Sequence, residues 1–200
     1  MRLVASGLAA VRSGRAVFAD QSFAVGSGEL LAVTGPNGSG KSTMLRLVAG
    51  LIRPAGGTVS LDPSAEEGVG AEVHYLGHLD ALKPSLTLSE NLSFWKKLWR
   101  GPGLQPGEAL DRLGLAHLAD LPAGILSAGQ KRRAAIARLL LANRPIWLLD
   151  EPTTALDVDA EKTLGRLIGK HLSDGGLVLA ATHRPLPVAS TATLRLGQAA

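Results

Sequence analysis

The chain has 200 residues, 46 % of them hydrophobic and 19 % charged, a balance typical of one globular domain or one core with an inserted lobe. Its net charge of +4 favours anionic partners but does not choose among nucleotides, lipid headgroups and nucleic acids. Cysteine is absent, so disulfide bonds are excluded as a source of stability, and a reducing compartment is consistent with the composition.

The N-terminal stretch MRLVASGLAAVRSGR raises the question of a signal peptide. Gly7 interrupts its apolar run and Arg12 ends it, so we predict a first β-strand instead. The internal apolar runs are far shorter than the ~20 residues that cross a bilayer. We therefore expect a soluble chain, whose membrane part, if its process has one, belongs to another chain.

The next elements form a strand, loop and helix. Residues 29–34, ELLAVT, predict a short buried strand, and a glycine-rich loop follows it. The pattern STMLRLVAG then predicts a helix that ends at Gly50. A further strand is predicted for AEVHYLG at residues 71–77.

The second half of the chain begins with a long helical stretch. Residues 80–143 are predicted to be mainly helical, with interruptions at their prolines. IWLLD at 146–150 and GLVLAAT at 176–182 are continuous apolar runs, as in parallel strands covered on both faces. This order predicts an α/β core interrupted by a mainly helical insertion.

The glycine-rich loop GPNGSGKST has the spacing G-x-x-x-x-G-K-[ST], between a strand and a helix as this motif requires. Its glycines allow backbone N–H groups to surround an anion, and the positive end of the following helix attracts phosphate. Lys41 is the candidate to reach the β- and γ-phosphates, and the Ser42 hydroxyl to bind Mg²⁺. The alternative is a flexible turn without a ligand. The candidate nucleotide-binding residues are Gly35, Pro36, Asn37, Gly38, Ser39, Gly40, Lys41, Ser42 and Thr43.

Two acids follow the apolar run IWLL. Asp150 and Glu151 follow a buried strand, and charges at the tip of a parallel strand face the ligand crevice. Asp150 is predicted to hold the Mg²⁺ shell, and Glu151 to orient or deprotonate an attacking water. By itself such a strand end is equally compatible with a structural role. The phosphate loop favours catalysis.

These motifs, with LSAGQ at 126–130, TALD at 154–157 and His183, resemble ATP-binding cassette ATPases in content and order over nearly the whole chain. The resemblance implies a single α/β domain over residues 1–200 that binds ATP and Mg²⁺ and hydrolyses ATP. Its P-loop NTPase core, with an N-terminal antiparallel β region, is expected at about 1–78 and 145–200. A helical subdomain is expected at about 79–144.

The segment LSAGQ resembles the family signature LSGGQ, with Ala128 as a departure. The resemblance implies that this segment is a second phosphate sensor, which completes the nucleotide site of a partner subunit. The resemblance thus implies a head-to-tail homodimer around two ATP molecules. The candidate residues are Ser127, Ala128, Gly129 and Gln130. The alternative is a plain helix cap.

Four further positions enter through the resemblance. His183 is similar to the switch histidine that contacts the γ-phosphate, and Asp157 closes the TALD motif of the nucleotide site. His78 stands where the family has a glutamine that links the core to the helical lobe. Arg12 stands where many members stack an aromatic ring on adenine, and a guanidinium plane also stacks on a base. Because His74 lies four residues before His78, a metal site that includes His78 stays open as an alternative.

Two segments have competing interpretations. Trp95 and Trp99 share a helix face, for which we favour packing within the helical lobe over partner contact, although this region of transporter ATPases receives a membrane subunit. The run KRR at 131–133 predicts a partly solvated face.

Within the family, His78, LSAGQ, THRPL at 182–186 and the short length most resemble the ATPase subunits of the haem exporters of bacterial cytochrome c maturation. This resemblance implies a peripheral subunit on the cytoplasmic side of the inner membrane, bound to integral membrane transporter subunits. No nucleic-acid partner is expected. The alternatives are another transporter's ATPase, an ATPase of this fold that acts on nucleic acid or ribosomes, and a nucleotide-binding module without turnover.

Overall fold

The computed structural model describes residues 1–66 and 68–197, and these form two compact units. The first unit contains residues 1–77, 144–152 and the chain from 168 onward. The second contains residues 78–143 and 153–167. The last three residues of the predicted core, 198–200, lie outside the described part of the chain.

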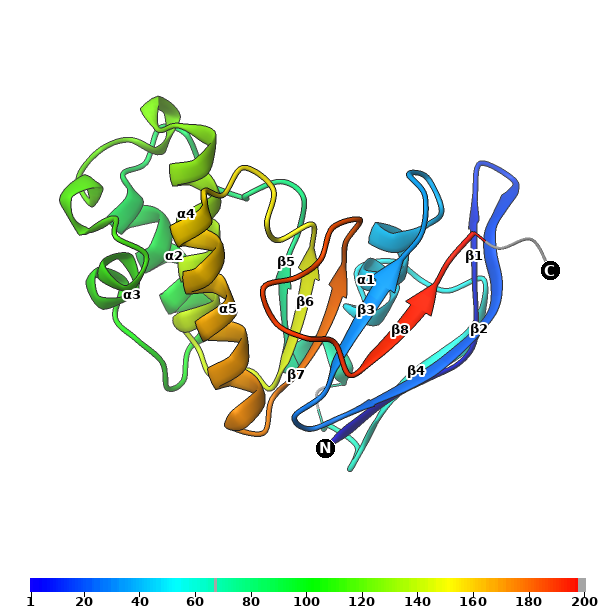
Figure 1. Ribbon diagram of the computed structural model, residues 1–200. Coiled ribbons are helices and arrows are strands. Elements are labelled where there is room, and N and C mark those ends of the chain that lie inside the picture. The colour runs from blue at the N-terminus through cyan, green and yellow to red at the C-terminus, as the bar shows by residue number, and fades with distance from the viewer. Residues whose placement is uncertain (67, 198–200) are drawn as a thin grey trace. The chain divides into compact units, whose positions relative to one another are not determined.

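Over the described residues, the first unit contains an antiparallel and a parallel sheet (Figure 1). The antiparallel order is β2–β1–β4, and the parallel order is β5–β6–β7–β3–β8. The antiparallel strands are β1 (Arg2–Arg12), β2 (Arg15–Gly26) and β4 (Gly56–Asp62). The parallel strands are β3 (Leu30–Thr34), β5 (Val73–Leu76), β6 (Ile146–Asp150), β7 (Leu177–Ala181) and β8 (Ala192–Arg195). The P-loop α/β fold class predicted from the sequence is confirmed.

Strand β1 resolves the question posed by the N-terminal stretch. It pairs with β2 through a two-residue turn in which Ser13 and Gly14 have φ values of +50° and +75°. Positive φ at both central residues is the geometry that suits a hairpin's right-handed twist. The predicted strand is therefore confirmed.

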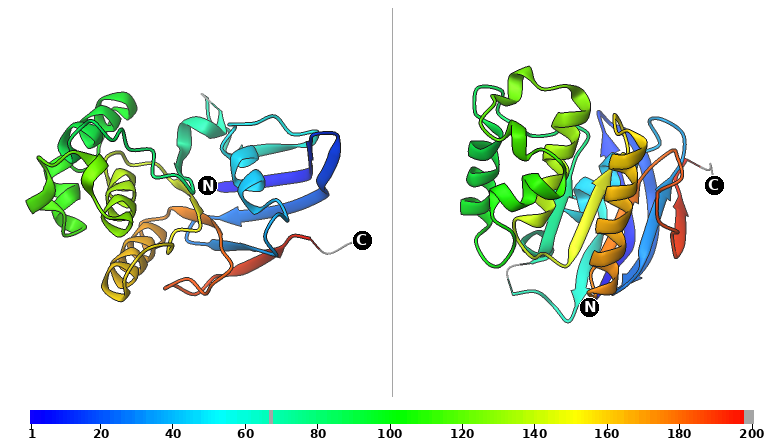
Figure 2. Two further views of the ribbon diagram at one scale, coloured as in Figure 1. Left: turned by 90° about the horizontal axis from the view of Figure 1, so that it is seen from above. Right: turned by 60° about the vertical axis from the view of Figure 1, so that its left-hand side comes forward.

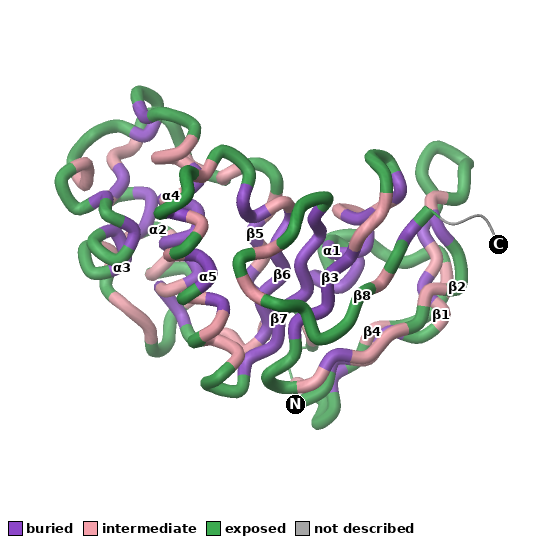
Figure 3. Tube along the Cα trace, in the orientation of Figure 1, coloured by how far each residue is buried: buried purple, intermediate pink, exposed green. Residues whose placement is uncertain are grey.

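Helix α1 (Lys41–Val48) lies between the two sheets (Figure 2). Its Met44 and Leu45 are fully buried, in a core that also contains Leu3 of β1 and Val33 of β3. All five residues of β6 and of β7 are buried, as Figure 3 shows, which confirms both predicted parallel strands. This packing holds the start of α1 at the parallel sheet.

The second unit is helical, as predicted for residues 80–143. Its elements are α2 (Leu88–Trp99), α3 (Pro106–Arg112), α4 (Ala128–Ala137), the first part of α5 (Val158–Ser173), and the 3₁₀ turns Ala116–Leu118, Ala123–Ile125 and Arg138–Leu140. One further 3₁₀ turn, Val69–Glu72, precedes β5 in the first unit. Thr87 and Glu90 form a capping box that starts α2, which satisfies backbone donors at that end. No helix among the described residues has the length and apolarity to span a membrane.

Arginines of the second unit are more buried than the sequence suggested. Arg132 is 4 % exposed and pairs with Asp80 at 3.2 Å, so the predicted solvated face at 131–133 is wrong for this residue. Arg138 donates to the backbone oxygen of Asp80 and lies over the ring of Trp95, 4.3 Å from its centroid. Burial lowers the pKa of Arg138 to about 10, which leaves it charged at neutral pH. The Trp95–Trp99 contact, 4.8 Å between ring centroids, supports the packing interpretation.

A stacked histidine makes stability depend on pH. The His171 ring lies 4.1 Å from the Trp147 ring at an interplanar angle of 10°, and a side chain on Gly176 would overlap it. Burial lowers the pKa of His171 below 6.5, so the folded state disfavours the proton that the unfolded chain accepts. The stability that neutral His171 contributes is therefore fully present above the pKa of histidine in the unfolded chain. It declines as pH falls through 6.5 toward the lower pKa of His171 in the folded state.

We expect the melting temperature to fall as pH drops below the pKa of free histidine. His171→Phe should reduce this dependence of the melting temperature on pH while keeping the ring stacking. Thermal unfolding followed by circular dichroism at a series of pH values measures it. His117→Gln removes an exposed imidazole and serves as the control with a wild-type slope. An unchanged slope in His171→Phe would contradict the assignment.

Candidate nucleotide-binding site

The phosphate loop, residues 35–43, connects β3 to α1 and depends on glycine geometry. Gly38 and Gly40 have φ values of +83° and +98°, which favour glycine. A side chain at Gly40 would come within 2.6 Å of Val17 Cγ1 and 2.8 Å of Phe18 Cδ1. The loop therefore packs closely on β2 and leads directly into the N-terminus of α1, where the helix dipole favours an anion.

Lys41 holds the loop in a curled shape. Its Nζ donates to the carbonyl oxygens of Gly35 at 2.9 Å and Pro36 at 3.2 Å, and the residue is 7 % exposed. Ser39 Oγ is buried and has no hydrogen-bond partner among the described residues. An orphaned buried hydroxyl in a cationic loop fits a site that a phosphate ligand completes. The motif residues therefore suit the triphosphate predicted from the sequence.

Hard oxygen donors meet beside the loop. The Ser42 hydroxyl donates to Asp150 Oδ1 at 2.9 Å, which joins the start of α1 to the end of β6. Asp150 is 1 % exposed, and Tyr75 Oη lies 3.3 Å from its Oδ2. Arg46 Nε donates to the same tyrosine oxygen at 3.4 Å. A hydroxyl and a carboxylate are the ligand types that Mg²⁺ prefers, so the donor chemistry fits this ion.

Glu151 and His183 face each other at the ends of neighbouring strands. His183 Nδ1 lies 2.8 Å from Glu151 Oε2, and the side chains are 56 % and 16 % exposed. Glu151 has φ of +48°, a rare conformation for a residue other than glycine, and its N–H donates to the Ala181 carbonyl at 2.9 Å. The Thr182 hydroxyl bonds to both the N–H and the carbonyl of Arg184, which fixes the turn that presents His183. Strained backbone of this kind is concentrated at functional sites.

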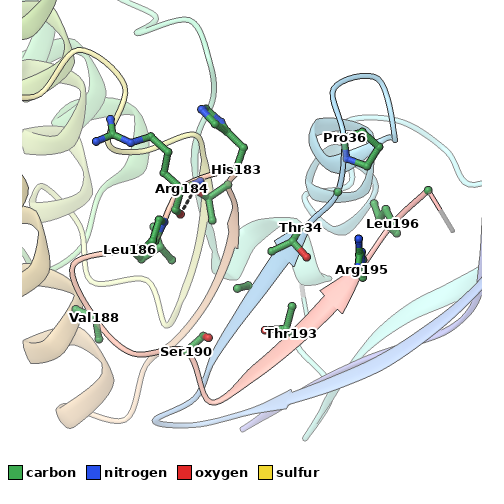
Figure 4. A pocket seen from close by; sticks show the side chains of 15 residues that line it. Thr34, Pro36, His183, Arg184, Leu186, Val188, Ser190, Thr193, Arg195 and Leu196 are labelled. Carbon is green, nitrogen blue, oxygen red and sulfur yellow. Dashed lines mark hydrogen bonds between the residues drawn. The ribbon is translucent and has the colours of Figure 1, made fainter.

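A pocket of about 880 Å³ lies beside this turn (Figure 4). Its lining includes Thr34 and Pro36 next to the phosphate loop, Arg195 of β8, and the turn residues His183 and Leu186. The phosphate loop and the His183 turn therefore border one concave surface within the first unit.

The signature segment in the second unit forms a capping box. Ser127 Oγ accepts from the Gln130 N–H at 3.2 Å, and Gln130 Oε1 accepts from the Ser127 N–H at 2.8 Å. A side chain on Gly129 would lie 2.9 Å from the Ala155 carbonyl oxygen, so this position favours glycine. Ser127 and Ala128 are exposed. The helix cap that the sequence allows as an alternative is present. The cap uses a lone pair of Ser127 Oγ and does not use the hydroxyl hydrogen, so this hydrogen is suited to donate to an anion.

The remaining predicted site residues are dispersed. Asp157 is exposed and caps α5, where its Oδ1 accepts from the Ala160 N–H at 2.8 Å. Arg12 is exposed at the end of β1, and His78 is exposed at the start of the second unit. His74 is fully buried. Within the described ranges, no group of three or more His, Cys, Asp or Glu gathers to hold a metal ion, so nothing supports the metal role considered for His78.

Tyr75 and Arg46 belong to none of the sequence motifs, although they contact the Asp150 end of the site. Tyr75 lies near the end of the predicted strand AEVHYLG, but its contact with Asp150 depends on β5 and β6 being neighbours in the sheet. The sequence carries no signal for that strand order.

Comparisons with known proteins agree with the geometry. A family model described as "ABC transporter" matches residues 18–154. The chain is 52 % identical over 201 residues to "Cytochrome c biogenesis ATP-binding export protein CcmA" of Rhodopseudomonas palustris (strain BisB5), with 100 % of both chains covered. It is 53 % identical over 198 residues to the protein of the same name in Bradyrhizobium diazoefficiens (strain JCM 10833 / BCRC 13528 / IAM 13628 / NBRC 14792 / USDA 110), with 98 % of both covered. Among solved structures, the dimeric post-hydrolysis state of the ATP-binding cassette MJ0796 bound to ADP and Pi superposes with a TM-score of 0.84 at 25 % identity, covering 97 % of this chain and 94 % of that one.

We expect Glu151→Gln to retain ATP binding and to reduce hydrolysis by about two orders of magnitude or more, because the amide keeps the shape but cannot accept the proton of water. A nucleotide-binding titration and a phosphate-release assay measure the two properties. Glu66→Gln makes the same chemical change at an exposed position and should hydrolyse ATP normally. Wild-type turnover in Glu151→Gln would remove Glu151 from the role of base.

Proposed function

This chain belongs to the ABC transporter family, and we propose that it is the ATP-hydrolysing subunit of a membrane export complex that serves cytochrome c biogenesis, with haem as the exported group. The observation that carries the proposal is that about half of the residues are identical, over nearly the full length of both chains, to proteins named cytochrome c biogenesis ATP-binding export protein CcmA. The contacts of Asp150 with Ser42 and of Glu151 with His183, together with the curled phosphate loop, support ATP as the energy source.

The proposed mechanism begins with the phosphate loop. Lys41, already buried inside the curl, exchanges its bonds to the Gly35 and Pro36 carbonyls for phosphate oxygens of ATP. The N-terminus of α1 adds its dipole. Arg12 is proposed to contact the adenine, because its exposed guanidinium has the planar shape that stacks on a base.

Mg²⁺ is proposed to be held by Ser42 and Asp150. When bound, the ion neutralises charge on the β- and γ-phosphates. Asp150 accepts the Ser42 hydroxyl hydrogen, so the lone pairs of Ser42 Oγ are directed away from the carboxylate and are free to face a cation.

Glu151 and His183 are proposed to act on the attacking water. Glu151 is mostly buried and accepts a proton as the water oxygen bonds to the γ-phosphorus and the bond to the ADP oxygen breaks. His183 Nδ1 lies 2.8 Å from the carboxylate, and its imidazole, the more exposed of the two side chains, is proposed to contact the γ-phosphate. The products are ADP and inorganic phosphate.

The unit boundaries suit a core and a helical subdomain. We propose that the first unit is the nucleotide-binding core and the second the helical subdomain. The second unit also takes residues 153–167, beyond the range of about 79–144 expected from the sequence.

A homodimer is proposed to complete the site. Cassettes similar to this chain, such as MJ0796, form dimers in solved structures. We propose that Ser127 and Gly129 of one subunit face the phosphates bound by its partner, head to tail. The exposure of Ser127 and the positive end of α4 support this role.

Integral membrane subunits are the proposed partners, with the chain peripheral on the cytoplasmic side of the inner membrane. Phe94 and Leu98 are 55 % and 58 % exposed on α2, and Leu79 is 82 % exposed in the same unit. Trp95 and Trp99 are engaged with Arg138, so the exposed apolar residues of α2 are the ones left to contact a partner. His78, next to Leu79, is proposed to link nucleotide state to this contact.

We expect the chain to co-purify with integral membrane proteins from detergent-solubilised membranes, and the double change Phe94→Ser, Leu98→Ser to reduce that recovery about tenfold, because apolar anchors dominate interfaces. Mass spectrometry quantifies the recovered proteins. Val11→Ser removes an equally exposed apolar side chain of the first unit and is the control. Recovery of RNA or DNA instead of membrane proteins would refute the transporter assignment.

The shared site has its own test. Lys41→Ala and Ser127→Arg should each abolish nucleotide trapping as homodimers, the first by removing the cation and the second by filling the phosphate position. Mixing the two should restore trapping at one site per mixed dimer, because that site combines an intact Lys41 with an intact Ser127. Labelled ATP retained after gel filtration measures it. No recovery, with subunit exchange shown independently, would contradict a site built from two subunits.

A further inference from the structure

We propose that Tyr75 is a positioning residue for the Asp150 carboxylate, and that Arg46 sets the direction in which the Tyr75 hydroxyl points. The inference rests on the proposed function, which assigns Asp150 to Mg²⁺-bound ATP. It adds to that function a part of the site that lies on β5, outside the phosphate loop and the strand that carries the acids.

Three elements of the first unit meet at this point. Asp150 ends β6, and Tyr75 lies on the neighbouring parallel strand β5. Arg46 lies on α1, one turn after Ser42. The contacts run from Arg46 Nε to Tyr75 Oη at 3.4 Å, from Tyr75 Oη to Asp150 Oδ2 at 3.3 Å, and from Ser42 Oγ to Asp150 Oδ1 at 2.9 Å.

The donors and acceptors allow one direction for this chain of bonds. A guanidinium only donates, so Arg46 must use a lone pair of the Tyr75 oxygen. The phenol has a single hydrogen, which then points to Asp150 Oδ2. An ionised carboxylate only accepts, so each of its oxygens receives a donor, one from Tyr75 and one from Ser42.

Burial makes this arrangement consequential. Asp150 is 1 % exposed, and a buried carboxylate that loses a donor is strongly penalised. With Oδ2 held by Tyr75, Oδ1 keeps its orientation toward Ser42 and the cation that the pair is proposed to bind.

The alternative is that Tyr75 only fills space. Its ring packs against the core between the sheets and α1, and Gly77 leaves room for it, since a side chain there would lie 3.1 Å from Tyr75 Cε1. Tyr75→Phe keeps the ring and removes only the hydroxyl. The two roles are therefore separable by one oxygen atom.

The experiment titrates Mg²⁺ against a fixed amount of fluorescent ATP analogue bound to the whole chain. We expect Tyr75→Phe to raise the half-saturating Mg²⁺ concentration about tenfold, the effect of losing one hydrogen bond to a charged group. Nucleotide affinity without Mg²⁺ should stay as in the wild type. Arg46→Met, which has no N–H to donate, should shift the Mg²⁺ dependence in the same direction but less, because the phenol hydroxyl remains and only the donor that orients it is lost. Thr58→Val, an exposed hydroxyl loss on β4, should shift nothing.

Asp150→Asn separates failure of this inference from failure of the proposed function. If Asp150→Asn leaves the Mg²⁺ dependence unchanged, the assignment of Asp150 to the ion is wrong. If Asp150→Asn alters it while Tyr75→Phe follows the wild type, the positioning role of Tyr75 is wrong.

The double variant adds a readout that a purely structural role would not produce. Because Tyr75 acts through Asp150, adding Tyr75→Phe to Asp150→Asn should cause no further shift. An additive shift would overturn the inference. If circular dichroism shows that Tyr75→Phe is unfolded, Arg46→Met alone decides: a wild-type Mg²⁺ dependence in that variant also overturns it.

Discussion

The parallel register of β3, β6 and β7 places their carboxyl ends at one edge of the sheet, and the candidate site of the first unit depends on it. The phosphate loop follows β3, Asp150 is the last residue of β6 and Glu151 comes directly after it, and His183 follows β7. Asp150 pairs with Ala181, so the acids and the histidine turn come from adjacent strand ends. Ligand sites of open α/β sheets form at this edge for the same reason.

Packing of β6, β7 and α1 fixes the positions of the side chains at this edge of the sheet. Full burial of β6 and β7 leaves these strands little freedom to shift, because a slip in register would misplace every contact along them. Burial of α1 between the sheets holds Ser42 against Asp150 and keeps Lys41 inside the loop. The charged side chains of the site are therefore already ordered, so they lose little conformational entropy when a ligand binds.

In the second unit, buried arginines are neutralised or hydrogen-bonded by one aspartate. The Asp80 carboxylate pairs with Arg132, its backbone oxygen accepts a hydrogen bond from Arg138, and Arg138 also lies over Trp95. This arrangement ties the segment after His78 to α4, the helix that begins at the signature. Buried ions of this kind are costly unless they are paired and hydrogen-bonded, which favours a single conformation of that segment.

The contrast between expectation and structure is clearest where a residue's role needs a distant partner. The run 131–133 suggested a solvated face because three cations in sequence are costly to bury, yet Asp80, more than fifty residues earlier, neutralises Arg132. The sequence of the signature segment allows Ser127 to be a phosphate sensor or a helix cap. The capping box with Gln130 makes the two uses compatible, since the cap needs a lone pair of the Ser127 oxygen and the phosphate contact needs its hydrogen.

The sequence by itself determined the α/β fold class, several strands and helices and the phosphate loop, because these depend on local spacing and on apolar periodicity. It indicated the family through the resemblance of its ordered motifs. Only the tertiary structure decided the strand order β5–β6–β7–β3–β8, the pairing of Glu151 with His183 and the contact of Tyr75 with Asp150. The physical reason is that a hydrogen bond between strand ends depends on which strands become neighbours. That choice is made by packing over the whole unit and leaves no mark within the motifs themselves.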